Sequence, residues 1–283
     1  MSRAEATTVM LGRRAGAPAI MARLAEAIME YGTEVHAVAD AEIRKLRHDP
    51  SEILTRAIQP AIWLVLFGEV MAQVRGITSD NGRYLDFLAP GILAQSVLFA
   101  AIFYGIAAIW ERDLGVLHRY MVSPAPRSAL VLGKALSSAV RGLTQAVMVY
   151  LLALALGIDV DISPVKLLGV ACMIALGSGL FSTFSLIIAC IVKTRERFMG
   201  IGQVLTMPIF FASNAIYPID IMPGWLKTIS RANPLTYQVD ALRALMLIGG
   251  QSKFGLAVDC LVLGATFVFL VFIAARLYPR MTT

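Results

Sequence analysis

The chain has 283 residues, of which 58% are hydrophobic and only 16% are charged, and its formal net charge is +6. A soluble domain carries roughly a quarter charged residues, so this composition excludes an ordinary soluble protein. It indicates an all-α integral membrane protein that crosses the bilayer several times. Cys172, Cys190 and Cys260 all lie in apolar stretches without metal or disulfide spacing, and we expect them to be core packing residues.

The first 56 residues are predicted to form a cytoplasmic tail with interfacial helices. Arginines interrupt every candidate apolar core of a signal peptide, so we expect none. The segment after Thr33 has helical apolar spacing, with Ile43 and Leu46 on an apolar side and Arg44 and Arg47 on a basic side. This pattern is typical of a helix that lies on anionic headgroups, and a solvated surface helix is the alternative.

Residues 57–283 are predicted to contain six membrane spans. They are expected near residues 57–74, 88–110, 129–157, 165–192, 198–217 and 255–276, each long enough to cross a hydrocarbon core of about 30 Å. Lysine and arginine are most frequent in the loops on the side of the N-terminus, so the positive-inside rule places both termini in the cytoplasm. One loop disagrees with this topology, because residues 218–254 are predicted outside but contain four basic residues.

The sequence carries no common hydrolase or ATPase motif. HExxH, GxSxG and GxxxxGK[ST] are absent, so metalloprotease, serine hydrolase and P-loop ATPase functions are not indicated. His36, His48 and His118 all lie outside the predicted spans. We therefore expect a protein that is not an enzyme and holds no metal or cofactor itself. The GSG run at 177–179 is interpreted as a site of close helix packing.

Four ionisable residues fall at or near membrane depth: Glu69, Asp86, Arg141 and Asp259. Intramembrane charges usually face a cavity or a pathway, which makes Glu69 and Arg141 candidates for lining a substrate path. The alternative is that such residues snorkel or lie at the interface, which is our interpretation of Asp86 and Asp259. The sequence has no run of intramembrane carboxylates resembling a proton relay, and this argues against a secondary transporter.

Two further segments have a pattern that a plain loop would not need. From Trp110 to Leu136 the chain combines charges, an apolar stripe at helical spacing and a Ser-Pro-Ala-Pro turn, which predicts a docking surface for a cytoplasmic partner. A plain connecting loop is the alternative for this segment. Farther along, Asn233-Pro234 breaks any helix, because proline disfavours helix for the residue before it and suits a helix's first turn. An amphipathic helix is predicted after Pro234.

Four stretches of the chain resemble one known family. Residues 84–92 (YLDFLAPGI) match its entry into the second span, and residues 111–135 (ERDLGVLHRYMVSPAPRSALVLGKA) match the loop that follows. Residues 208–225 (PIFFASNAIYPIDIMPGW) match the end of its fifth span, and residues 231–243 (RANPLTYQVDALR) match its next signature. The chain therefore resembles an ABC transporter permease of the second exporter type, the superfamily of daunorubicin-resistance and nodulation lipo-oligosaccharide export permeases.

The resemblance implies a pair of permease chains above two separate ATPase subunits, which bind ATP and magnesium. Val116, Ser123 and Asn214 depart from the family, where threonine, threonine and glycine are common. The residues expected to couple to the ATPase are Glu111, Arg112, Asp113, Leu114, Gly115, Leu117, Arg119, Met121 and Arg127, beside a gate helix that includes Ile43, Arg44, Leu46 and Arg47. The expected translocation path includes Leu66, Phe67, Glu69, Arg141, Phe210 and Phe211.

The disagreeing outer loop is then expected to fold back into the membrane. Helices near 222–231 and 235–248 would form a re-entrant hairpin, spanning 222–250, that dips into the outer leaflet as a lid under protein cover. The lid residues are Asn233, Pro234, Tyr237, Asp240 and Arg243, and we expect Asp240 to pair with Arg243 three positions later.

The function implied by the resemblance is export across the plasma membrane of a bacterial or archaeal type of cell. The expected substrate is a hydrophobic or amphipathic molecule such as a drug, a lipid or a glycolipid. A polysaccharide or lipo-oligosaccharide exporter is the alternative within this class. A secondary transporter and a membrane assembly factor are the alternatives from other classes. The second permease chain is either an identical copy or a paralogue, and membrane lipids surround the pair.

Overall fold

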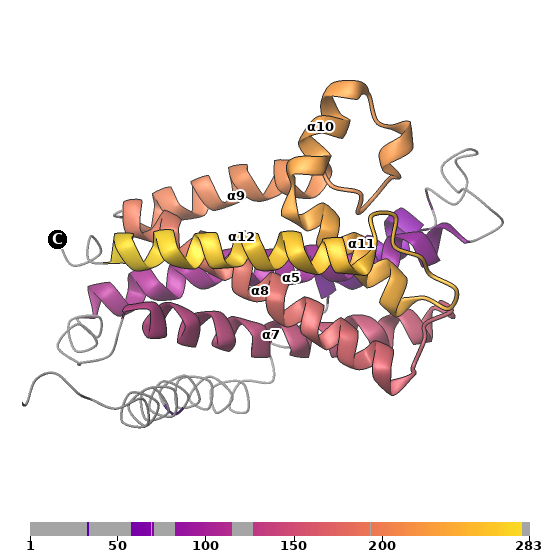
Figure 1. The fold of residues 1–283 in the computed structure, drawn as a ribbon, viewed down its shortest axis with the longest axis horizontal. Helices are drawn as coiled ribbons and strands as arrows, with labels where there is room; N and C mark the ends of the chain where they lie inside the picture. Colours follow the sequence, from indigo (N-terminus) through magenta and orange to yellow (C-terminus); the bar gives the residue numbers. More distant parts are fainter. Residues whose placement is uncertain are drawn as a thin grey trace, which may run out of the picture.

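The computed structural model describes residue 33 and residues 58–68, 70, 83–114, 127–192 and 194–278, with the backbone alone for 127–129. Helices make up nearly all of this part of the chain (Figure 1). They are η1 (Trp63–Phe67, inside a helix that begins at Ile58), α5 (Tyr84–Asp113), α7 (Arg127–Ala155), α8 (Pro164–Ile191), α9 (Arg195–Phe211), η2 (Ile219–Ile221), α10 (Gly224–Ala232), α11 (Pro234–Met246) and α12 (Leu256–Leu277). The predicted all-α class is confirmed for these residues.

The long helices α5, α7, α8, α9 and α12 lie along the long axis of the molecule (Figure 1). The last residues of α5, α8 and α12 and the first residues of α7 and α9 meet at one end of this bundle. We call it the inner end, because the positive-inside rule predicts that it faces the cytoplasm. Near the opposite, outer end α11 packs against α5, α8 and α12, while α10 stands to the side of the bundle (Figure 1).

The core lies around α5 and α8, and the sides of the bundle are apolar. On α5 the side chains of Leu88, Ile92 and Ile102 are fully buried, and α8 packs against α5, α7, α11 and α12. The outward side of α12 exposes Val268 and Phe269 instead of polar residues. A soluble protein does not leave such large apolar faces in water, so this surface fits contact with lipid chains.

Small residues let the central helices approach each other closely. The Gly105 amide of α5 donates a hydrogen bond to the Ser185 hydroxyl of α8 at 3.1 Å. A Cβ at Gly177 of α8 would collide with the side chain of Gln238 on α11. The interpretation of the 177–179 run as a packing site is therefore confirmed.

Four of the described helices are long and apolar enough to cross a membrane: Tyr84–Asp113, Leu130–Ala155, Pro164–Ile191 and Leu256–Leu277. They correspond to the second, third, fourth and sixth predicted spans. The predicted fifth span, 198–217, was wrong at its end, because α9 stops at Phe211. The chain turns there: the Ser213 hydroxyl donates to the Phe210 carbonyl at 2.6 Å and accepts from the Ala215 amide at 3.2 Å. A total of six spans stays a prediction.

Two other expectations need correction. Cys190 is buried, but Cys172 and Cys260 are exposed, because they lie on outward sides of α8 and α12 and are not in the core. Asp259 does not face the interface, since its side chain is fully buried and accepts a hydrogen bond from Ser252 at 2.8 Å. The helix pattern alone did not reveal which face of each helix was covered by protein.

Candidate functional site

The inner end of the bundle is held together by charged side chains from three helices. Glu111, in the last turn of α5, forms an ion pair with Lys134 of α7, which is only 8% exposed. Asp113 binds Arg112 at 3.0 Å and Arg195 of α9 at 2.8 Å. These contacts tie the end of α5 to the first turns of α7 and α9.

An aromatic contact strengthens this junction. The Arg195 guanidinium lies over the Trp110 ring, with its carbon 3.7 Å from the ring centroid. Such a cation–π contact contributes roughly 0.5–1 kcal/mol at an exposed site, and the surface ion pairs add little more individually. Together these contacts hold the ends of α5, α7 and α9 in one arrangement. Leu114, which follows α5 at the surface of this junction, is 70% exposed.

The predicted coupling and gate residues divide into two groups. Glu111, Arg112, Asp113 and Leu114 lie together at the inner end as described, and Arg127 begins α7 with its backbone alone described. The predicted residues Gly115, Leu117, Arg119, Met121, Ile43, Arg44, Leu46, Arg47 and Glu69 lie outside the described residues. Their roles stay predictions.

The predicted path residues do not share one surface. Leu66 and Phe211 are exposed, whereas Phe210 is fully buried, edge-on to Trp63 with ring centroids 5.8 Å apart. Phe67 stacks on Trp63, with 4.5 Å between the centroids. Phe210 and Phe211 therefore face different surroundings, because neighbouring positions on α9 point in different directions, and the path stays a prediction.

Arg141 lies against α5, where its guanidinium carbon is 5.2 Å from the centroid of the Tyr104 ring. A recess of about 160 Å³ between the helix Ile58–Phe67, α5 and α7 is lined in part by Gln59, Ser96 and Gln145. The recess has an otherwise apolar lining, and its amides and hydroxyl are not among the ionisable residues that mark intramembrane sites in the sequence. Glutamines inside apolar runs were the signal that could have found it.

The break between α10 and α11 is built around Asn233. Its side-chain oxygen accepts the Leu235 amide at 3.0 Å and caps α11, while its side-chain nitrogen donates to the Ile209 carbonyl of α9 at 2.6 Å. Pro234 occupies the first turn of α11, where a missing amide hydrogen costs nothing. One side chain thus fixes α11 against the end of α9.

The predicted pair of Asp240 and Arg243 does not form. Asp240 accepts hydrogen bonds from the Ser252 hydroxyl at 2.8 Å and the Phe254 amide at 3.0 Å. Arg243 points elsewhere, donating to the Asn214 carbonyl at 3.0 Å and lying over the Phe87 ring.

Tyr237, another predicted lid residue, donates its hydroxyl to the Arg231 carbonyl at 2.7 Å. Its ring packs against Phe254, with the centroids 5.1 Å apart. This hydrogen bond links α11 back to α10, and the ring contact links it to the loop before α12.

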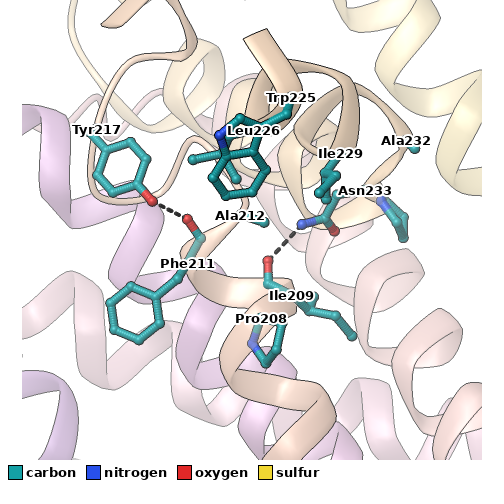
Figure 2. Close-up of a pocket in the computed structure, with 11 residues that line it drawn as sticks. Pro208, Ile209, Phe211, Ala212, Tyr217, Trp225, Leu226, Ile229, Ala232 and Asn233 are labelled. Atoms are coloured by element: carbon teal, nitrogen blue, oxygen red, sulfur yellow. Dashed lines mark hydrogen bonds between the residues drawn. The ribbon is translucent and has the colours of Figure 1, made fainter. Parts of the chain in front are cut away.

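An apolar recess of about 610 Å³ lies between the end of α9 and α10 (Figure 2). Its polar atoms are already used, because the Asn233 amide and the Tyr217 hydroxyl both donate to carbonyls of α9. Within the described part of the chain, no group of three or more histidine, cysteine or acidic side chains could hold a metal ion.

The chain matches the model of the ABC-2 type transporter family over residues 33–247. It belongs to that family. The putative transport permease ycf38 of Cyanophora paradoxa is 30% identical over 203 residues, covering 71% of this chain and 70% of the relative.

Two further relatives of this ABC-2 permease carry more informative names. The daunorubicin resistance ABC transporter permease protein DrrB1 of Streptomyces coeruleorubidus is 25% identical over 201 residues, covering 71% of this chain and 70% of the relative. Nodulation protein J of Rhizobium meliloti (strain 1021) is 25% identical over 236 residues, covering 81% and 86%. The resemblance inferred from the sequence is confirmed, and the chain is a transport permease.

Proposed function

We propose that this ABC-2 permease is the membrane subunit of an ATP-driven exporter, in which two permease chains act with two separate ATPase subunits that bind ATP and magnesium. The observation that carries the proposal is the inner end, where three helices are linked by Glu111–Lys134 and Asp113–Arg195. A movement imposed on the end of α5 would be passed to α7 and α9 through these contacts. That is what a force-transmitting junction requires.

The coupling surface in this proposal begins at exposed Leu114 and continues through the loop to Arg127. The gate helix, with Ile43 and Leu46, would lie beside it. Closure of the ATPase pair on ATP would move these elements as levers and bias the permease between inward-facing and outward-facing states. Both termini would be cytoplasmic, in the plasma membrane.

The proposed substrate is a hydrophobic or amphipathic molecule such as a drug, lipid or glycolipid. The daunorubicin resistance name of one relative supports this class. A lipo-oligosaccharide or polysaccharide is the second candidate. It is favoured by the polar side chains of Gln59, Ser96 and Gln145 in the smaller recess and by the similarity to nodulation protein J.

The second permease chain would pack against the side of the bundle formed by the helix Ile58–Phe67 and α9. Ile62, Leu66 and Phe211 are exposed there, and Trp63 connects the two helices through Phe210. An exposed apolar face on adjoining helices is typical of an interface in the membrane plane. The substrate would pass along the seam between the two chains.

The test is co-purification with the ATPase that a neighbouring reading frame with a Walker A motif would encode. We expect stable co-elution of the wild-type pair, and loss of at least nine-tenths of the bound ATPase in Leu114→Asp and in Leu117→Asp, because a buried unpaired charge opposes docking. Ile162→Asp places the same charge on an exposed apolar residue at the outer end and is the matched control. Equal ATPase binding by Leu114→Asp, Leu117→Asp and Ile162→Asp would exclude this docking surface.

A further inference from the structure

The recess between α9 and α10 is open to the surroundings of the protein. Figure 2 shows Leu226 and Ile229 of α10 on one side and Pro208 and Ile209 of α9 on the other. At its edge Trp225 is 67% exposed and Ile229 is 48% exposed. Water in this recess would lie mainly against apolar walls. An apolar occupant is strongly favoured over water in such a site.

The location of α10 restricts the occupant. α10 lies to the side of the bundle and not beyond its outer end (Figure 1). At that level it borders the lipid that surrounds the neighbouring spans. The exposed Trp225 fits this level, because tryptophan is enriched where a membrane meets water.

The charges of α10 lie on its other face. At helical spacing, Lys227 and Arg231 fall opposite the side that carries Trp225 and Ile229. Neither basic side chain has a hydrogen bond or ion pair with another described residue. Both lie near Asp220, whose carboxylate binds Lys253 at 2.5 Å. The hydrogen bond from Lys253, with smaller effects of Lys227 and Arg231, keeps the pKa of Asp220 below its usual range.

This cluster therefore has an excess of positive charge. Three cations, Lys227, Arg231 and Lys253, face one carboxylate, Asp220, so two positive charges lack a counterion within it. A helix with an apolar face and a basic face lies in the membrane interface. Its apolar face is buried in the hydrocarbon, and its basic side chains lie among the lipid headgroups. The complement of this surface is an amphiphile with apolar chains and a negatively charged head.

We propose that the recess between α9 and α10 binds the acyl chains of an anionic phospholipid of the outer leaflet, whose headgroup lies against Lys227 and Arg231. The lipid fills the space beneath α10 and holds the α10–α11 hairpin at the level of the interface. Each basic residue beside an anionic lipid surface contributes roughly a fivefold preference. The site does not depend on which substrate the transporter carries.

Tryptophan fluorescence tests this site directly. The chain has three tryptophans, and Trp63→Phe with Trp110→Phe leaves Trp225 as the reporter while keeping aromatic rings at both positions. This variant is reconstituted in vesicles of equal parts phosphatidylcholine and phosphatidylglycerol, with bromine on the acyl chains of one lipid or the other. We expect brominated phosphatidylglycerol to quench Trp225 at least twofold more strongly than brominated phosphatidylcholine.

Variants separate the two parts of the proposal. Lys227→Gln with Arg231→Gln should abolish the preference for phosphatidylglycerol while quenching by acyl-chain bromine persists. Lys166→Gln, which removes a cation of α8 at the same end of the bundle, should leave the preference unchanged. Ile229→Asp should weaken quenching by both lipids, because a carboxylate in the recess opposes entry of acyl chains.

Three results would overturn the proposal. Equal quenching by the two lipids would show ordinary lipid contact without a site for an anionic headgroup. Absence of quenching, with a disulfide between copies of an Ile229→Cys variant in a background where the native cysteines are serine, would show that a second permease chain covers the recess. Absence of both signals would show that the recess holds neither. Loss of ATPase binding is a separate measurement, so failure of the exporter proposal is distinguishable from failure of this one.

Discussion

Gly91 lets α5 approach the turn after α9 more closely than a residue with a side chain would. A Cβ built at this position would lie within 3.0 Å of the Ala215 backbone, which cannot rotate away as a side chain can. The Tyr84 hydroxyl, two turns earlier on α5, donates to the Ile216 carbonyl at 2.8 Å in the same turn. The start of α5 and the exit from α9 are therefore fitted together at backbone contact.

Gly91→Ala is expected to lower the free energy of unfolding by about 1–3 kcal/mol, the usual cost of forcing extra volume into a packed site. Thermal unfolding of the purified protein in detergent measures this change. The matched control is Gly264→Ala on α12, where an added Cβ meets nothing within 4 Å and alanine is the better helix former. An unchanged midpoint in Gly91→Ala, equal to that of Gly264→Ala, would contradict the close contact.

Single residues also show how far local sequence reasoning extends. Asn233-Pro234 predicted the break between α10 and α11, because the chemistry of a helix start depends on residues adjacent in sequence. The pairing of Asp240 with Arg243 was wrong for the opposite reason. Spacing places the two on neighbouring positions of α11, but stronger partners come from Asn214 and Ser252, which only the fold brings near.

At the scale of elements, the ion pair of Glu111 and Lys134 joins α5 to α7 at the inner end. Removing one partner of a shielded pair leaves a charge without compensation. We expect Glu111→Lys to lower the free energy of unfolding by about 2 kcal/mol, and Lys134→Glu in the same chain to restore at least half of that loss. Thermal unfolding of the two single variants and the double variant forms a double-mutant cycle. Additive losses in the double variant would show that the pair does not link the helices.

Some helix boundaries were predicted from the sequence, and others depend on contacts that the sequence alone does not reveal. The ends of α8 and α12 lay within one residue of the limits predicted for the fourth and sixth spans. The end of α9 did not, since the apolar run continues past Phe211 and the turn depends on the Ser213 hydroxyl. Phe210 and Phe211 show the consequence, because one enters the core and the other faces outward.

At the scale of the whole molecule, the basic residues of the loop 218–254 contradict the positive-inside rule only if the whole loop is a solvated connection. The Arg243 guanidinium packs inside the protein over the Phe87 ring, and Lys253 forms an ion pair with Asp220. Lys227 and Arg231 remain on α10, where lipid headgroups would balance them in our proposal. Composition and charge thus predicted the membrane class, and the family signatures predicted the permease. The side-chain arrangement of the outer end required contacts between residues far apart in sequence.

The central claim is that this permease and a separate ATPase form one machine whose force enters at the inner end of α5. The most direct measurement is ATP hydrolysis by the purified ATPase in vesicles that contain wild-type permease, Leu114→Asp or Ile162→Asp. We predict that wild-type and Ile162→Asp change the hydrolysis rate equally, and that Leu114→Asp removes at least nine-tenths of that change while remaining folded in the membrane. A hydrolysis rate that is the same with and without wild-type permease would contradict the account.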